Sequence, residues 1–257
     1  MYSLGRVLNH KILNKSGKYL QRWPDKPKVM IFGPPNVPVT KLSQRLAIDL
    51  GVPVINMDDE FNKIKQYAGK NEDYNHPFFK KVKEILEAGD LDTISKEKLG
   101  AKLLRITDYA QEGFILNGFP YSVADAESLE EMDGGMNAFL HISMPEVFLA
   151  QMESSKYQCE DWNAIYWRED IVDEETGTSQ KSNYPEDGFC NDCGSIHIKP
   201  ATDPETFEDN LQSYSDRKDK LLEFYNHIGL LVDVELKMGG LEDYETMKRK
   251  LQYSIKF

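Results

Sequence analysis

The chain has 257 residues, of which 31 are lysine or arginine and 43 are aspartate or glutamate, so its formal net charge is −12. A chain of this length can bury one sizeable core and carry an inserted subdomain. The negative charge argues against nucleic acid or an anionic membrane surface as the main partner. No apolar run approaches the roughly 20 residues that a membrane-spanning helix needs. Three cysteines are too few for a disulfide framework and indicate a reducing compartment.

The first 27 residues form a basic arm. No acidic residue precedes Asp25, and the cations before it are Arg6, Lys11, Lys15, Lys18 and Arg22. Leu4, Leu8 and Ile12 recur at helical spacing, which predicts an amphipathic segment. Such a segment is typical of mitochondrial targeting, and equally of an extension that docks on a partner protein. We therefore expect a mitochondrial protein, with a cytoplasmic, cytoskeletal or axonemal location as the alternative if the arm is retained.

A strand, a loop and a helix follow the arm. The apolar run Val29–Phe32 predicts a buried strand that ends at Gly33. Beyond the loop, Leu42 and Leu46 recur at helical spacing until Gly51, which is a typical helix stop. This order of elements is the layout of a phosphate-binding P-loop.

The loop lacks the residues with which a P-loop binds phosphate. Such a loop needs glycines whose N–H groups converge on the phosphate, followed by a lysine and a hydroxyl residue. Asn36 and Pro38 stand where inner glycines belong, and Val39 stands where the lysine belongs. Lys41 is the nearest substitute, but at about 100° per residue it is rotated roughly 200° from Val39. We therefore expect Lys41 to point away from a phosphate at the loop.

The frame around this loop resembles the adenylate kinases. That family carries Gly-Pro-Pro-Gly-x-Gly-Lys-Gly-Thr and then a helix and a Gly-x-Pro turn, a pattern onto which residues 33–59 can be laid without a gap. A second family signature, Gly-Phe-x-Leu-Asp-Gly-Phe-Pro-Arg, is similar to residues 113–121. The resemblance implies an α/β domain over residues 28–257, with a P-loop-type parallel sheet flanked by helices. It also implies two inserted subdomains, a nucleoside-monophosphate-binding (NMP) segment at residues 59–92 and a lid at residues 152–203.

Most positions that hold nucleotide in this family carry other residue types here. By the resemblance they are Met57, Asn62, Tyr121 and Asp125 on the monophosphate side, and Met152, Lys156, the Lys199-Pro200 region and Asn210 on the lid side. Asn117 replaces an aspartate near the family's metal–phosphate cluster and brings no charge for Mg²⁺. What remains of the nucleotide site is Gly33, Pro34, Pro35, Asn36, Thr40, Lys41 and Asn117. We therefore expect no catalytic residue, and neither nucleotide nor Mg²⁺ as a firmly bound cofactor.

Further patterns predict the other elements of the domain. Buried strands are expected at residues 52–55, 114–116, 138–142 and 230–234, and helices from residues 144, 204 and 241. The acidic run Asp58-Asp59-Glu60 is expected to cap a helix that begins near Phe61. Because His141 falls inside a predicted strand, we expect it to be a hydrogen-bonded strand residue and not a catalytic base.

The three cysteines suggest a metal site in the lid. Some adenylate kinases hold the lid with structural zinc bound by two Cys-x-x-Cys pairs. Cys190 and Cys193 resemble an intact pair, and Cys159 resembles the remaining half of the other. The resemblance implies zinc bound by Cys159, Cys190 and Cys193, with Asp161 or His197 as fourth ligand, since zinc accepts S, N and O donors. The alternative is a decayed site with three free thiols.

Three functions from different classes remain open. The first is a catalytically degenerate adenylate-kinase-like protein that acts as a structural or accessory subunit of a larger assembly, docked on protein partners partly through residues 1–27. The second is an active or weakly active adenylate or nucleoside monophosphate kinase with displaced residues. The third is a nucleotide-binding sensor without turnover. We expect the first, because the lid is acidic where the family's lid is rich in arginine, and an acidic lid repels polyphosphate.

Overall fold

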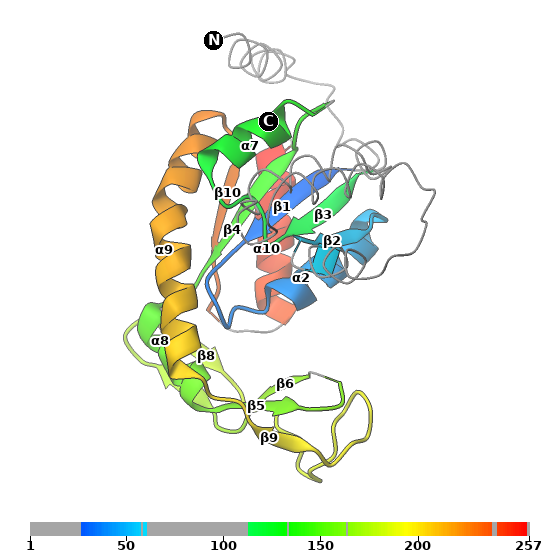
Figure 1. Cartoon of the computed structure of the whole chain (residues 1–257), viewed down its shortest axis with the longest axis vertical. Coiled ribbons are helices and arrows are strands. Elements are labelled where there is room, and N and C mark those ends of the chain that lie inside the picture. The colour runs from blue at the N-terminus through cyan, green and yellow to red at the C-terminus, as the bar shows by residue number, and fades with distance from the viewer. Residues whose placement is uncertain are drawn as a thin grey trace, which may run out of the picture.

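A five-stranded sheet forms the centre of the protein in a computed structural model that describes residues 27–57, 59–60, 113–132, 134–162, 164–237 and 241–255 (Figure 1). Its strands are β1 (Lys28–Phe32), β2 (Val54–Asn56), β3 (Phe114–Asn117), β4 (Ala138–Ser143) and β10 (Leu231–Glu235). Their order is β10-β4-β1-β3-β2, and every neighbouring pair is parallel. The predicted α/β fold with a P-loop-type parallel sheet is therefore confirmed.

Helices cover both faces of this sheet. They are α2 (Val39–Leu50), α7 (Val123–Glu130), α8 (Glu146–Ser154), α9 (Pro204–His227) and α10 (Leu241–Ile255). Side chains of β1 alternate between two apolar layers, because successive residues of a strand point to opposite faces. Val29 and Ile31 pack with residues of α2, α8 and α10, whereas Met30 and Phe32 pack with residues of α7 and α9. A sheet buried on both faces explains why its strands are continuously apolar.

The helix after β2 begins earlier than the sequence predicts. Met57 is already helical, as are Asp59 and Glu60, so Phe61 is not the start. Met57 is fully buried and follows β2 directly, so Asp59 and Glu60 lie inside the first turn of the helix and not before it. The rest of the predicted NMP segment, including Asn62, lies outside the described residues, as does the predicted basic arm apart from Pro27.

A smaller β-structure, called the lid below, lies between α8 and α9 and projects from one end of the core (Figure 1). It contains β5 (Lys156–Cys159), β6 (Ile165–Trp167), β7 (Ile171–Asp173), β8 (Thr178–Gln180) and β9 (Ile198–Pro200). Strands β6, β5 and β9 form an antiparallel sheet, and β7 pairs with β8 as a hairpin. Trp167 and Ile171 join the apolar layer of the core, so the base of the lid packs on the domain that carries it. Within the described part of the chain, no helix is both long and apolar enough to cross a membrane.

Candidate functional site

The loop between β1 and α2 lies at the carboxyl edge of the parallel sheet, where open α/β sheets bind ligands. Asn36 has a φ of 68°, and it is the one non-glycine residue with positive φ in the described part of the chain. Glycine adopts this left-handed conformation freely, and asparagine tolerates it better than most residues. The bend of a P-loop is therefore kept at Asn36 although its glycine is lost.

The N–H groups at the end of the loop do not converge on a ligand position. Pro38 has no N–H at all, and it occupies the N-cap of α2 without a capping side chain. The N–H of Val39 donates to the carbonyl oxygen of Val37 at 2.7 Å, so it points back into the loop. Two donors that an anion would need at the start of α2 are thus missing or already used.

A buried carboxylate from α8 contacts this loop. The Glu153 side chain is 4% exposed, and its Oε2 accepts from Asn36 Nδ2 at 3.0 Å and from Lys156 Nζ at 3.1 Å. Its Oε1 accepts from the backbone N–H of Asp203 at 2.8 Å. The Asn36 amide also donates to the carbonyl oxygen of Leu149 at 3.2 Å. Every oxygen of this buried carboxylate is therefore hydrogen-bonded, as a buried charge requires.

These contacts join three segments that are far apart in sequence. Glu153 lies at the end of α8, where the chain enters the lid, and Asp203 is the N-cap of α9, where the chain leaves it. Asn36 belongs to the loop of the core. We call this arrangement of Asn36, Glu153, Lys156 and Asp203 the hinge clasp. It fastens both ends of the lid to the loop.

Sequence reasoning missed Glu153. One signal was available: Glu153 follows Leu149 by four residues, and so shares the buried face of α8. An acidic residue at such a position is buried only with partners. The retained positions Thr40 and Lys41 lie on the exposed side of α2, whereas Leu42 and Ser43 are buried between this helix and the core.

Asn117 is bonded to α2 inside the protein. The Oδ1 of Asn117 lies 2.6 Å from the Ser43 hydroxyl, and this hydroxyl also lies 2.7 Å from the carbonyl oxygen of Val39. The Nδ2 of Asn117 is buried and has no hydrogen-bond partner. The single hydroxyl proton cannot serve both acceptors. Rotating the amide by half a turn resolves this, because Nδ2 then donates to Ser43 and Ser43 donates to Val39. In either orientation the Asn117 amide is committed to the helix.

Two further predicted positions have structural roles. Asp125 is buried and completes a capping box at the start of α7, accepting from the N–H of Ser122 at 2.9 Å and from that of Tyr121 at 3.2 Å. The guanidinium of Arg217, which sequence reasoning also missed, lies 5.3 Å from the centre of the Tyr121 ring. It lies 5.8 Å from the Phe32 ring as well, so its charge is held by aromatic faces.

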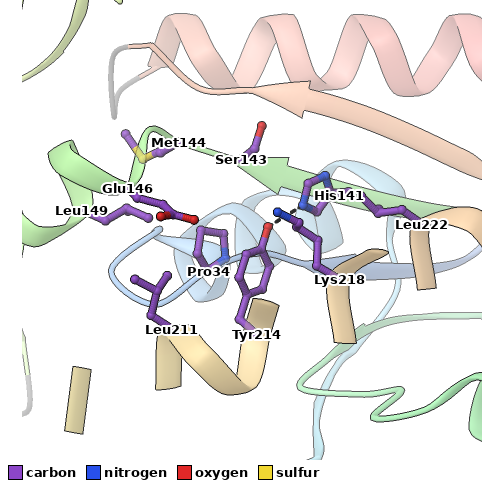
Figure 2. Close-up of a pocket in the computed structure, with 10 residues that line it drawn as sticks. All are labelled: Pro34, His141, Ser143, Met144, Glu146, Leu149, Leu211, Tyr214, Lys218 and Leu222. Carbon is purple, nitrogen blue, oxygen red and sulfur yellow. Dashed lines mark hydrogen bonds between the residues drawn. The ribbon is translucent and has the colours of Figure 1, made fainter. Parts of the chain in front are cut away.

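A cavity of about 200 Å³ lies beside the loop, between the end of β4, the start of α8 and one side of α9 (Figure 2). It is lined by Pro34, His141, Ser143, Met144, Glu146, Leu149, Leu211, Tyr214, Lys218 and Leu222. Pockets that hold drug-sized ligands measure about 300–1,000 Å³. This cavity is below that range and suits at most a small molecule.

His141 is hydrogen-bonded at both ring nitrogens, as the sequence predicts. Nδ1 lies 2.8 Å from the carboxylate of Asp233. Nε2 lies 2.6 Å from the hydroxyl of Tyr214, and these two side chains are drawn in Figure 2. Because a carboxylate only accepts, Nδ1 carries the proton, and the neutral ring accepts at Nε2 from the Tyr214 hydroxyl. Burial raises the pKa of Tyr214, so this hydroxyl stays a donor.

Burial lowers the pKa of His141 below 6.5, although its hydrogen bond to Asp233 acts in the opposite direction. The unfolded chain therefore binds this proton first as the pH falls below 6.5, and folding stability decreases through that window, by at most about 1.4 kcal/mol per pH unit. We predict that His141→Asn makes the free energy of unfolding less dependent on pH between about pH 7 and 5.5. The exposed His227→Asn variant is the control and should keep the wild-type slope. Equal slopes in urea titrations of all three proteins would contradict the assignment.

Comparison with known proteins agrees with the fold. The adenylate kinase of Archaeoglobus fulgidus is 24% identical over 230 residues, which cover 87% of this chain and 95% of that protein. That of Rhizobium rhizogenes is 25% identical over 233 residues (88% and 97%), and that of Thermotoga neapolitana is 27% identical over 218 residues (82% and 90%). No family model matches the chain. The chain is a relative of the adenylate kinases.

This relationship marks the chain as adenylate-kinase-like, a class of nucleotide-binding proteins. The family implies a magnesium nucleotide at the loop. The described residues do not supply the donors with which a P-loop binds a magnesium nucleotide. Pro38 has no backbone N–H, and Val39 has no positive charge where the P-loop lysine would stand. Asn117 is uncharged and bonded to Ser43. The buried Glu153 adds negative charge to a loop that would have to bind an anion.

The lid of this adenylate-kinase-like chain brings its three cysteines together. The sulfur atoms of Cys159, Cys190 and Cys193 all lie within 4.8 Å of one another, and those of Cys159 and Cys193 are 3.6 Å apart. Ligands of tetrahedral zinc with Zn–S bonds of about 2.3 Å are separated by about 3.8 Å, so these thiols fit one ion. The Tyr166 hydroxyl hydrogen-bonds to Cys190 at 3.2 Å and lowers the pKa of this thiol, which favours its thiolate, whereas burial and the neighbouring thiols raise the pKa of Cys193.

The predicted fourth ligands lie outside this cluster. The Asp161 carboxylate accepts from the hydroxyl of Ser195 and lies 3.0 Å from Nδ1 of His197, and both Asp161 and His197 are exposed. They pair with each other at the surface instead of pointing at the sulfur atoms. Three protein ligands are therefore the set that the described residues provide.

Proposed function

We propose that this chain is a catalytically degenerate adenylate-kinase-like protein that serves as a structural or accessory subunit of a larger assembly. The observation that carries the proposal is the hinge clasp, in which the loop uses its Asn36 amide to bind the protein's own Glu153 carboxylate. A loop whose donor is already bonded to an internal carboxylate has fewer free donors for an external phosphate. Phosphoryl transfer depends almost entirely on positioning and electrostatic stabilisation, so these losses affect its main source of rate.

The charge of the lid supports the same proposal. Residues 152–203 contain twelve acidic and four basic side chains. Closing this lid over a nucleotide would bring negative charge against its phosphates, which costs free energy in a site from which water is excluded. A catalytic lid needs the opposite sign.

The position of the clasp supports a structural role. Lids of enzymes open and close about a few hinge residues at the ends of the moving segment. Here Glu153 and Asp203, at the two ends of the lid, are hydrogen-bonded to each other at 2.8 Å. Fastened hinges suit a lid that serves as a fixed surface.

We further propose that residues 1–27 hold the chain in its assembly, because this segment is basic and amphipathic and carries no acidic residue before Asp25. A mitochondrial assembly is the location that this composition favours. A cytoplasmic, cytoskeletal or axonemal assembly is the alternative for an arm that is retained.

Calorimetric titration with nucleotides tests the proposal. We expect no saturable heat when Mg²⁺–ATP, ADP or AMP is added to the full chain, whereas the adenylate kinase of Archaeoglobus fulgidus in the same buffer gives a binding isotherm. Saturable binding without turnover would identify a nucleotide sensor, and binding with turnover would identify a kinase. Either result would overturn the proposal.

The cysteine cluster fits a structural zinc ion, which would staple the lid through three thiolates. We predict about one zinc per chain in freshly purified protein, strongly reduced zinc in Cys190→Ser, and unchanged zinc in His197→Ala, whose ring lies outside the cluster. Structural zinc can supply on the order of 10 kcal/mol of apparent folding free energy in small sites. A chelator should therefore expose the lid to protease. Elemental analysis that finds no zinc in the wild-type chain would refute this prediction.

A further inference from the structure

Exposed apolar side chains gather on the lid. In the described part of the chain, the exposed large apolar residues are Ile48, Val147, Trp162, Val172, Phe189 and Ile196. Four of these six belong to the lid, and Trp162 and Ile196 are 62% and 65% exposed. Single exposed apolar residues need no explanation, but a group of them marks an interaction site.

Three of these residues are adjacent to one hydrogen-bonded network around the cysteine cluster. The N–H of Cys190 donates to the carbonyl oxygen of Ser195 at 2.7 Å, which brings together the residues that flank this pair, Phe189 and Ile196. The carboxylate of Asp161, which precedes Trp162, accepts from the hydroxyl of the same Ser195. We call Trp162, Phe189 and Ile196 the lid tip.

Acidic residues lie close to the lid tip in the sequence. Glu186 and Asp192, which are within four residues of Phe189 or Ile196, are exposed and form no salt bridge with any described residue. The lid as a whole has eight more acidic than basic residues, two thirds of the net charge of the chain. A partner that complements this surface must be basic and carry apolar side chains.

The chain itself contains a segment with this chemistry. Residues 1–24 carry five lysine or arginine residues and no acidic residue, and Leu4, Leu8 and Ile12 recur along them at helical spacing. This segment joins the core at the start of β1, whereas the lid emerges beyond the carboxyl ends of the parallel strands, at the opposite edge of the sheet (Figure 1). Because the attachment point of the arm and the lid lie at opposite edges of the sheet, we place the contact between two copies.

We propose that the lid tip of one copy binds residues 1–24 of a second copy. This inference rests on the proposed function, in which the N-terminal arm holds the chain in its assembly, and it names the surface that the arm contacts. The two contacting surfaces differ, so the contact is head-to-tail and produces a ring or an open chain of copies. Because opposite charges drive it, salt must weaken it.

Sedimentation velocity of the full chain tests this contact by charge reversal. We expect the wild-type chain to associate in about 50 mM salt and to lose at least tenfold in affinity in about 500 mM salt. The arm-reversed variant Lys11→Glu/Lys15→Glu and the lid-reversed variant Glu186→Lys/Asp192→Lys should each be monomeric. An equimolar mixture of the two should associate again, because one reversed arm then faces one reversed lid.

Neutral substitutions separate the apolar part of the contact. Trp162→Ser should weaken association at least tenfold, whereas Ile48→Ser, which removes an even more exposed apolar residue from α2 of the core, should leave it unchanged. Circular dichroism confirms that each variant is folded.

Three results would overturn the inference: a wild-type chain that is monomeric in low salt, association that survives both charge reversals, or a mixture of reversed variants that stays monomeric. Association lost with Trp162→Ser but kept in the arm-reversed variant would show that a different surface of the second copy covers the lid tip, and would also overturn it. None of these results bears on nucleotide binding, so the proposed function is tested separately by the calorimetric titration with nucleotides.

Discussion

Replacing Val39 with lysine is expected to leave the protein without useful phosphoryl transfer from ATP to AMP. The new ammonium would supply one charge, but Pro38 would still lack an N–H, and the Asn36 amide would still donate its hydrogen bond to Glu153. One preorganised donor is typically worth roughly 3–4 kcal/mol of transition-state stabilisation, and an arginine at the phosphoryl group about 10³ to 10⁵ in rate. These groups act as a unit, so restoring one of them recovers little.

A coupled assay of ADP formation measures this expectation in a series of variants. Val39→Lys, and the loop variant Asn36→Gly/Pro38→Gly/Val39→Lys, should both stay well below the turnover of about 1 s⁻¹ at which kinases commonly begin. Tyr121, Met152 and Asn210 remain without guanidinium groups in both variants. The Archaeoglobus fulgidus adenylate kinase serves as the positive control. Turnover above about 1 s⁻¹ in Val39→Lys would show that one lost charge was the whole defect.

Glu153→Ala is expected to lower the free energy of unfolding by about 2–4 kcal/mol. The substitution removes a buried carboxylate with three hydrogen-bonded partners, so the Asp203 N–H loses its acceptor and the Asn36 amide loses one of its two acceptors. The loss is at the lower end of the range for broken buried ion pairs, because Lys156 is 21% exposed and can turn to water. The loop and both ends of the lid should loosen together, since the clasp joins them.

Glu160→Ala is the matched control for this measurement. Glu160 is also a paired glutamate near the lid, 2.8 Å from Lys199, but its side chain is 51% exposed. Exposed pairs contribute about 0–1 kcal/mol, so this variant should unfold near the wild-type midpoint. Hydrogen exchange at the end of α8 and the start of α9 should accelerate in Glu153→Ala and not in Glu160→Ala. Equal stability of the two variants would contradict the role of the hinge clasp.

The fold could be read from the sequence because its signals are local. The apolar run of β1 and the leucine spacing of α2 each lie within about a dozen residues, and Gly51 ends the helix in the left-handed conformation that its position predicts. The start of the helix after β2 was mispredicted although a local signal was present. Asn56, a residue type favoured at the N-cap, directly precedes the helical and buried Met57.

The candidate site was only partly readable. The sequence shows that the P-loop glycine is replaced by Pro38 and the P-loop lysine by Val39, because the P-loop pattern gives the position of each. What replaces them depends on tertiary contacts: Asn36 and Glu153 are 117 residues apart, and Ser43 and Asn117 are 74 apart. No periodicity links positions at such separations.

The metal ligands illustrate the same limit at shorter range. The resemblance to the adenylate kinases brought Cys159 into the predicted zinc site, and the structure places all three thiols together. The sequence could not reveal that the Asp161 carboxylate pairs with His197 and not with the metal site. That contact joins residues 36 apart and depends on the directions of both side chains.

The central claim is that this relative of the adenylate kinases no longer transfers phosphate between nucleotides. Its most direct test is to incubate the purified wild-type chain with Mg²⁺, ATP and AMP, and to follow ADP by phosphorus NMR. We predict ADP formation no faster than in protein-free buffer, at any ratio of the two nucleotides. Turnover above about 1 s⁻¹, retained after a second purification step and absent from a mock preparation, would contradict the claim.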